Sequence, residues 1–249
     1  MSVLYVNVIN EIQKIFAQRK TKGMLGFALF IPAVLAGILD YTQHRWGVRI
    51  FSGTDFSFLV LDWLTTTILP LFIFMVSIEL FVGESSTRTL KLTLVRPITR
   101  WKVYASKVLA MGIFVMLMLG LIGIGSVTAG SLMFHGASFN ALLQVLLAYA
   151  IDFIPMLTLG IFAVFIGQYL NHTGSAFALC TMLFFIAKIA VMFFPSLEAF
   201  LFTSYTDWHS LWINSSVPVN DLIHITLVIL SSLVLFFTIG LYQFEIKEV

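Results

Sequence analysis

The sequence is poor in charge and in cysteine. Only 10% of its 249 residues are charged, whereas a soluble domain carries about 25%. The one cysteine, Cys180, excludes a disulfide within the chain and lies in an apolar run, which is typical of a small buried residue. A net charge of +2 is too small to indicate a nucleic-acid partner. Since 59% of the residues are hydrophobic and the mean hydropathy is +1.00, the composition indicates an integral membrane protein.

Motifs for nucleotide binding, metal binding and nucleophilic catalysis are also missing. The sequence contains no GxxxxGK[ST], so the chain has no Walker A loop for ATP. It contains neither HExxH nor GxSxG. The five histidines are scattered, and no two have the i, i+4 spacing of metal ligands on a helix. We therefore expect no metal site, no bound cofactor and no catalytic residues in this chain.

Six apolar runs are candidates for transmembrane helices, each of which needs about 20 apolar residues. The first run is short and interrupted by Pro32, and the fourth is long enough to tilt or to kink at Pro155. The N-terminus is not expected to be a cleavable signal peptide, because basic residues precede the first run and no small-residue cleavage site follows it. We predict one all-α integral membrane domain over residues 1–249. Its spans are residues 24–39, 58–82, 108–133, 141–170, 175–195 and 222–242.

Most basic residues fall on one side of these spans. Four precede the first span, six lie between the second and third, and one follows the sixth, so eleven of the 14 share a side. Arg45 and Arg49 fall on the other side, and Lys188 lies inside a span. Because lysine and arginine are enriched on the cytoplasmic side of membranes, both termini are predicted to be cytoplasmic in a plasma-membrane protein.

Residues 1–22 have the pattern of an amphipathic helix that is too short and too polar to span a membrane. A basic group ends this segment and would anchor it to lipid headgroups, so we expect it to lie in the cytoplasmic interface. The alternative is a frayed tail. The apolar positions are Leu4, Val8, Ile12, Ile15 and Phe16, with Asn7, Glu11, Lys14 and Gln18 off that face.

Aromatic residues gather in residues 196–221, on the predicted external side. Aromatic rings with polar tips favour the membrane interface, so we expect short helices that lie on the outer leaflet or dip into it. The alternative is a plain interfacial loop. The candidate residues of this segment are Phe200, Tyr205, Trp208 and Trp212.

Three ionisable residues within the spans are candidates for function: Glu79, Asp152 and Lys188. A charge at bilayer depth costs at least ~2.5–3.5 kcal/mol, so each needs a partner or water. At 1.5 Å per residue, Asp152 lies ~17 Å and Lys188 ~12 Å from the outer ends of their helices, a difference that the lysine stem could cover. The two would form a structural ion pair or a polar patch in a translocation path. Glu79, near the cytoplasmic end, would snorkel or pair with the basic loop that follows it.

The basic loop over residues 83–107, between the second and third spans, is the strongest indication of function. Five of the 14 basic residues lie within fewer than twenty positions of this loop. Glu84 begins a segment typical of a helix start, and Leu90 and Leu94 follow at helical spacing. Pro97 then ends the helix, since the residue before a proline is disfavoured in helical geometry. We predict a short cytoplasmic helix that docks a soluble partner; the alternative is a topological anchor without a partner.

In this loop the chain resembles the permease subunits of the ABC-2 family of ATP-driven exporters. That family has an acidic residue, a Thr-Leu pair, a proline and an arginine in similar order between its second and third spans. Residues 11–16 are similar to the family's interfacial helix, whereas Arg88 stands where many members have glycine. The matching residues are Glu84, Arg88, Thr89, Leu90, Leu92, Pro97 and Arg100, followed by Lys107.

The resemblance implies that the loop is a coupling helix, which inserts in a groove of a separate ATP-binding subunit. Two permease chains, identical or homologous, would assemble with two ATPase chains in the membrane lipid, and ATP and Mg²⁺ would bind to the ATPase. Short members resemble bacterial self-protection transporters for lantibiotic or bacitracin-type peptides and exporters of small drugs or sodium. The residues expected to couple to the ATPase are Glu84, Arg88, Thr89, Leu90, Leu92, Leu94, Arg96, Pro97 and Arg100.

The chain is therefore predicted to be the permease subunit of an exporter for an amphipathic or hydrophobic substrate, such as an antimicrobial peptide or a drug. It would not itself be an enzyme. One alternative is a stand-alone membrane immunity or sensor protein without an ATPase partner. Others are an intramembrane enzyme that uses Glu79, Asp152 and a histidine, and an ion-coupled carrier.

Overall fold

The computed structural model describes residues 3–46, 52–84, 99–134, 139–213 and 218–246. This part of the chain is helical, and six helical segments are long and apolar enough to cross a membrane. The prediction of an all-α protein with six spans is confirmed. We number the spans 1 to 6 in chain order; they are Arg19–Arg45, Gly53–Gly83, Arg100–Met133, Asn140–Gly167, Thr173–Phe193 and Val219–Ile246.

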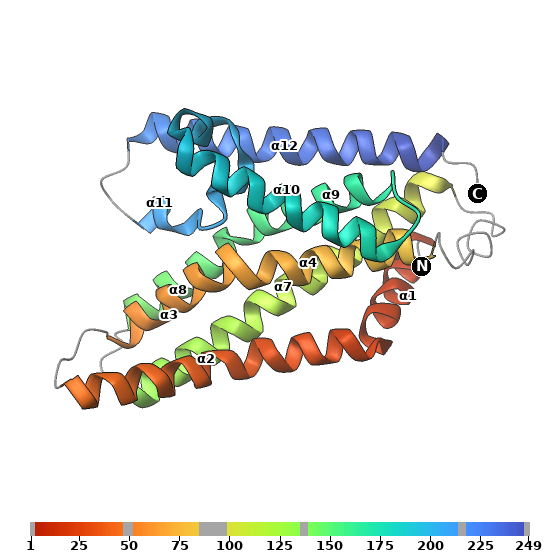
Figure 1. Cartoon of the computed structure of the whole chain (residues 1–249). Coiled ribbons are helices and arrows are strands. Elements are labelled where there is room, and N and C mark those ends of the chain that lie inside the picture. Colours follow the sequence, from red (N-terminus) through yellow and green to blue (C-terminus); the bar gives the residue numbers. More distant parts are fainter. Residues whose placement is uncertain (1–2, 47–51, 85–98, 135–138, 214–217, 247–249) are drawn as a thin grey trace.

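The spans form one elongated bundle (Figure 1). Helix α2 (Arg19–Trp46) packs along α7 (Arg100–Met133) on one side, while α10 (Thr173–Phe193) and α12 (Val219–Ile246) lie on the other. Both termini lie at the same end of the bundle in Figure 1, as an even number of spans requires. We call this end the termini end and the opposite end the far end.

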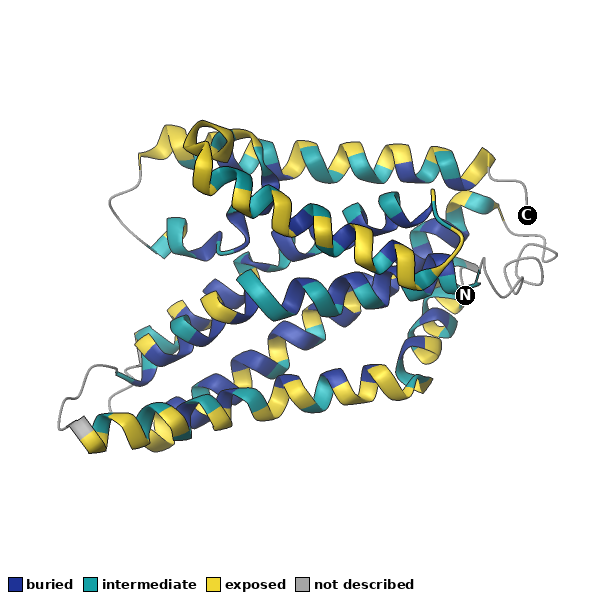
Figure 2. Cartoon of the chain, in the orientation of Figure 1, coloured by how far each residue is buried: buried dark blue, intermediate teal, exposed yellow. Residues whose placement is uncertain are grey.

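Burial is concentrated in the middle of the bundle (Figure 2). Met111 and Phe114 of α7 are fully buried, whereas Phe30, Met192 and Leu227 of the outer helices are exposed. Exposed apolar faces of this kind suit contact with lipid, which cannot hydrogen-bond to a protein.

Span 1 runs through Pro32 without a break, as part of the 28-residue helix α2. The prediction that this proline interrupts the first span is therefore wrong. Gly125 of α7 faces Pro32, and a side chain at that glycine would come within 3.1 Å of the Leu29 carbonyl oxygen. Because neighbouring helices can compensate for a proline in a membrane helix, the close approach of α7 supports the continuous helix.

Span 2 is made of four consecutive segments: α3 (Gly53–Trp63), η1 (Leu64–Ile68), α4 (Leu69–Ile78) and η2 (Glu79–Gly83). Ser52 and Asp55 form a capping box at its start, so orphan N–H groups of the first turn are satisfied. Both η segments are π-helical turns, a feature that is frequent at functional sites.

Span 4 breaks at Asp152, between α8 (Phe139–Ile151) and α9 (Phe153–Gly167). The sequence predicts a kink at Pro155, three residues further on. A proline ring collides with the carbonyl four residues before it, which here belongs to Ile151. The break therefore lies one turn ahead of the proline that causes it.

The segment between spans 5 and 6 contains three short helices: η3 (Pro195–Phe200), η4 (Phe202–Tyr205) and α11 (His209–Ile213). Short helices are thus confirmed here. They pack against α8, α9, α10 and α12 of their own chain. Tyr205 and Trp208 are buried, whereas Phe200 and Trp212 are exposed, so the aromatic residues divide between the interior of the bundle and its surface.

Helix α1 (Val3–Ala17) precedes the bundle and packs against α7. Its most buried residues are Glu11 and Ile15. The prediction that Glu11 lies off the buried face is wrong, because this carboxylate has a charged partner inside the bundle.

Candidate functional site

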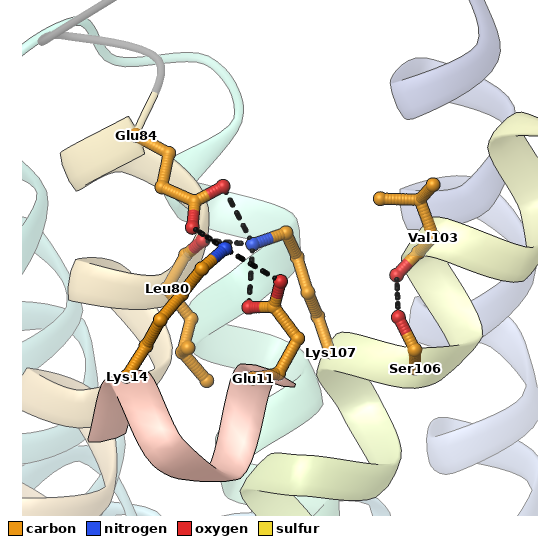
Figure 3. Close-up of polar contacts among 7 residues, drawn as sticks. All are labelled: Glu11, Lys14, Leu80, Glu84, Val103, Ser106 and Lys107. Carbon is orange, nitrogen blue, oxygen red and sulfur yellow. Dashed lines mark hydrogen bonds and ion pairs between the residues drawn. The ribbon is translucent and has the colours of Figure 1, made fainter. Parts of the chain in front are cut away.

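Lys107 is the centre of an ionic network at the termini end (Figure 3). It lies on α7 and is fully buried. Its ammonium nitrogen is 2.9 Å from Glu11 Oε2, 2.8 Å from Glu84 Oε2 and 3.0 Å from the Leu80 carbonyl oxygen. An ammonium group has three N–H donors, so each donor of Lys107 has an acceptor.

Lys14 completes the network from the side of α1. Its Nζ is 2.8 Å from Oε1 of Glu11 and 2.8 Å from Oε1 of Glu84. Each carboxylate therefore contacts both lysines, one through each oxygen, and the four charges balance. The ionic network, as we call Glu11, Lys14, Glu84 and Lys107, joins α1, the end of span 2 and the start of span 3.

The charges of the ionic network stabilise one another. Burial by itself would raise the pKa of Glu84, but the charge and hydrogen bond of Lys107, together with Lys14, lower it below its usual value. Burial would likewise lower the pKa of Lys14, but hydrogen bonds to Glu11 and Glu84 raise it. Removal of one member of a buried ion pair leaves its partner uncompensated, which costs about 3–5 kcal/mol.

The basic loop begins and ends at this network. Glu84 directly precedes residues 85–98, and Lys107 lies about two turns into α7. Arg100, at the start of α7, donates a hydrogen bond of 2.7 Å to the Glu245 carbonyl at the end of span 6. Among the expected coupling residues, Arg88, Thr89, Leu90, Leu92, Leu94, Arg96 and Pro97 lie outside the described residues.

Glu79 pairs with Lys20 of α2, at 3.3 Å between Nζ and Oε2. The sequence predicts that Glu79 snorkels or forms a salt bridge with the basic loop. The partner found among the described residues is instead Lys20, at the start of span 1. Both side chains are partly exposed, and exposed pairs contribute about 0–1 kcal/mol. The Glu79 pair is therefore a weaker contact than the neighbouring ionic network.

A second polar cluster lies toward the far end, around His209 of the segment between spans 5 and 6, which we call the external segment after its predicted side. The Asp152 carboxylate accepts a hydrogen bond of 2.8 Å from the His209 backbone N–H and lies 2.7 Å from its ring Nδ1. The other ring nitrogen, Nε2, is 3.2 Å from Asp62 Oδ1. Burial would lower the pKa of His209, but the bonds to Asp152 and Asp62 raise it to about 9, so the ring is positively charged at neutral pH.

Asp152 and Lys188 have different partners in the structure. Asp152 binds His209, whereas the Lys188 ammonium donates a 2.8 Å hydrogen bond to the Thr206 hydroxyl. No Asp152–Lys188 ion pair is found among the ion pairs of the described residues, so the proposed pairing is wrong. Both residues instead attach the external segment to the bundle, one from span 4 and one from span 5.

Sequence reasoning missed Asp62, Glu11 and His209. Asp62 lies inside the second predicted span, so the signal for it was a lone acid in an apolar run. Glu11 and His209 gave no such signal, because their buried partners, Lys107 and Asp152, are 96 and 57 residues away. Only the packing of α1 on α7 and of α11 on α8 brings these groups together.

No metal site is found within the described ranges, where no group of three His, Cys, Asp or Glu side chains could hold an ion. The predicted trio for an intramembrane enzyme does not form one site either. Asp152 and His209 touch, but Glu79 lies with Lys20 near the termini end.

The stretch that contains the ionic network and the two acids of the second cluster matches a known family. Residues 8–188 match the family model described as ABC-2 family transporter protein. The matched stretch includes the whole ionic network together with Asp62 and Asp152, and it ends before the external segment that supplies His209. A comparison with curated proteins gave no match.

Proposed function

Since the chain belongs to the ABC-2 transporter family, we propose that it is the permease subunit of an ATP-driven exporter. Members of this family are transmembrane transport components and are not themselves catalytic. ATP and Mg²⁺ would bind to two copies of a separate ATPase subunit, and a second permease chain, identical or homologous, would complete the transporter. Its substrate would be amphipathic or hydrophobic, such as an antimicrobial peptide or a drug.

The ionic network is the observation that carries this proposal. Its members Glu84 and Lys107 lie near the two ends of the basic loop and are bonded to each other at 2.8 Å. A force applied to residues 85–98 would therefore act on spans 2 and 3 together. The network also includes Glu11 and Lys14, so α1 would move with these spans.

The proposed transport cycle begins at the basic loop. ATP binding would draw the two ATPase subunits together, and the loop docked on each would follow. The buried salt bridges would transmit this displacement, because a charged group in a low-dielectric interior separates from its partner only at a high cost. Spans 2 and 3 would then tilt and change access to the substrate path between the cytoplasm and the outside.

Capture of the ATPase tests the proposal. A tagged full-length chain, solubilised in mild detergent from its native membrane, should retain a protein that photolabels with azido-ATP. The triple variant Leu90→Asp, Arg96→Glu, Arg100→Glu should lose at least tenfold of this labelled partner, because it removes the apolar and basic contacts of the predicted coupling helix. The matched control is Arg19→Glu with Lys22→Glu, which reverses two charges on the same predicted side outside the loop.

Two outcomes would contradict the proposal. Full retention of the ATPase and its activity by the triple variant would show that residues 85–98 do not couple to it. Absence of any nucleotide-binding partner with the unmodified chain would favour the stand-alone immunity or sensor protein instead.

A further inference from the structure

Three residues from three elements form a contact that we call the histidine clasp: Asp62 of span 2, Asp152 of span 4 and His209 of the external segment. One imidazole ring touches a carboxylate through each of its two nitrogens. The clasp lies away from the termini end, and the ionic network does not include it. If the spans moved, either the Asp62–His209 contact or the Asp152–His209 contact would break first.

The two arms of the clasp differ in strength. The Asp152 side chain is fully buried and forms two short contacts with His209, one to the backbone and one to the ring. The Asp62 side chain is 51% exposed and forms one contact of 3.2 Å. Exposure weakens an ion pair, because water screens the charges and solvates the carboxylate once it is released. The Asp62 arm is therefore the one that breaks first.

The external segment has further attachments to spans 4, 5 and 6. Thr206 accepts the hydrogen bond from Lys188 of span 5. Phe202 packs against Phe162 of span 4 and Phe236 of span 6, with ring centroids 5.5 and 5.3 Å apart. Loss of the Asp62 contact would thus leave the external segment in place on these spans, while the His209 ring would still stack on Phe58 of span 2, with ring centroids 6.2 Å apart.

Span 2 contains two irregular turns that would allow it to move. The π-helical segment η1 begins two residues after Asp62, and π-helical turns interrupt the regular helix ladder. The second such segment, η2, lies beside Glu84 at the other end of the same span. Span 2 therefore connects the ionic network to the weak arm of the clasp, with an irregular turn next to each.

We propose that the Asp62–His209 contact is a gate contact at the far end, which parts when span 2 moves while the Asp152–His209 contact persists. The inference rests on the proposed function, since ATP binding to the ATPase subunit docked on the basic loop supplies the movement. His209 is a positioning residue in this scheme: it keeps the external segment against span 4 and holds span 2 only in the closed state.

Paired cysteines test the proposal in the assembled transporter. In a Cys180→Ala background, the pair Asp62→Cys, His209→Cys is treated with a short bis-methanethiosulfonate crosslinker, with and without ATP and vanadate. The crosslinking rate should fall at least fivefold in the trapped state. The matched pair Asp152→Cys, His209→Cys should crosslink at the same rate in both states.

A single substitution, with ATPase activity as the measured quantity, gives a second test. Asp62→Asn should raise ATPase activity without substrate at least twofold, because the closed state loses a stabilising contact. The control is Asp40→Asn, which alters an acid toward the far end of α2 that pairs with His44 and not with the clasp. It should leave this activity unchanged. Folding of each variant is checked by size-exclusion chromatography of the complex.

The outcomes separate the two proposals. If no ATPase co-purifies with the unmodified chain, the proposed function fails. If an active ATPase is present but both cysteine pairs respond alike, or neither responds, or Asp62→Asn has normal basal activity, the gate contact is wrong.

Discussion

Span 2 contacts one cluster of charged residues toward each end, the ionic network and the histidine clasp. The two clusters differ in charge balance and in exposure. The ionic network has two lysines and two glutamates that share their bonds, and every donor of Lys107 is satisfied. The histidine clasp has one imidazole between two carboxylates, one of them half exposed. A balanced buried network suits a joint that must stay closed, whereas an unequal clasp suits a contact that opens.

The largest expected effect on stability comes from breaking the ionic network. Lys107→Met should lower the free energy of unfolding by about 3–5 kcal/mol, because Glu11 and Glu84 lose a buried positive charge. Thermal unfolding of the purified chain in detergent measures the change. The matched control is Lys102→Met, one turn and a half earlier on α7 and only partly buried, for which the change should stay below about 1 kcal/mol. Equal losses in the two variants would show that Lys107 is not the centre of a stabilising network.

The next prediction compares how much each of the two carboxylates of the histidine clasp contributes to stability. Asp152→Asn should destabilise the protein by about 1.5–3 kcal/mol, since hydrogen bonds to a charged group are lost from a buried site. Asp62→Asn should cost less than about 1 kcal/mol, because its side chain is half exposed. The same unfolding measurement compares them. A larger loss for Asp62→Asn would reverse the order of strength on which the gate contact depends.

The smallest expected effect is a dependence on pH. The pKa of His209 is raised from 6.5 to about 9 in the folded protein, so its contribution is complete below 6.5 and is lost as pH rises through about 9. Between pH 7 and pH 10 the melting temperature should fall by about 2–4 °C more in the unmodified protein than in His209→Gln. The pKa of Lys14 is raised above its usual 10.5, so Lys14 stays mostly charged up to pH 10 in both proteins and cancels from the difference. Identical pH profiles would mean that the ring carries no stabilising charge.

Sequence patterns predicted the elements well and their partners poorly. Six apolar runs are enough to predict six spans, because a bilayer imposes a minimum apolar length on each helix. The extent of the basic loop, which rests on local charge and on Pro97, stays a prediction because residues 85–98 lie outside the described residues. Lys107 was recognised only as the residue that opens the third span, since neither Glu11 nor Glu84 is near enough in sequence to indicate a buried network.

The sequence by itself determined an all-helical membrane protein, its likeness to ABC-2 permeases and the position of its basic loop. Composition and periodicity carry this information because each helix meets the same apolar solvent. Only the tertiary structure decided that Asp152 binds His209, that Lys188 binds Thr206, and that span 2 has a strong joint near one end and a weak contact toward the other. The physical reason is that a charge in a membrane must find a partner, but the sequence does not show which of the distant candidates packing will bring within 3 Å.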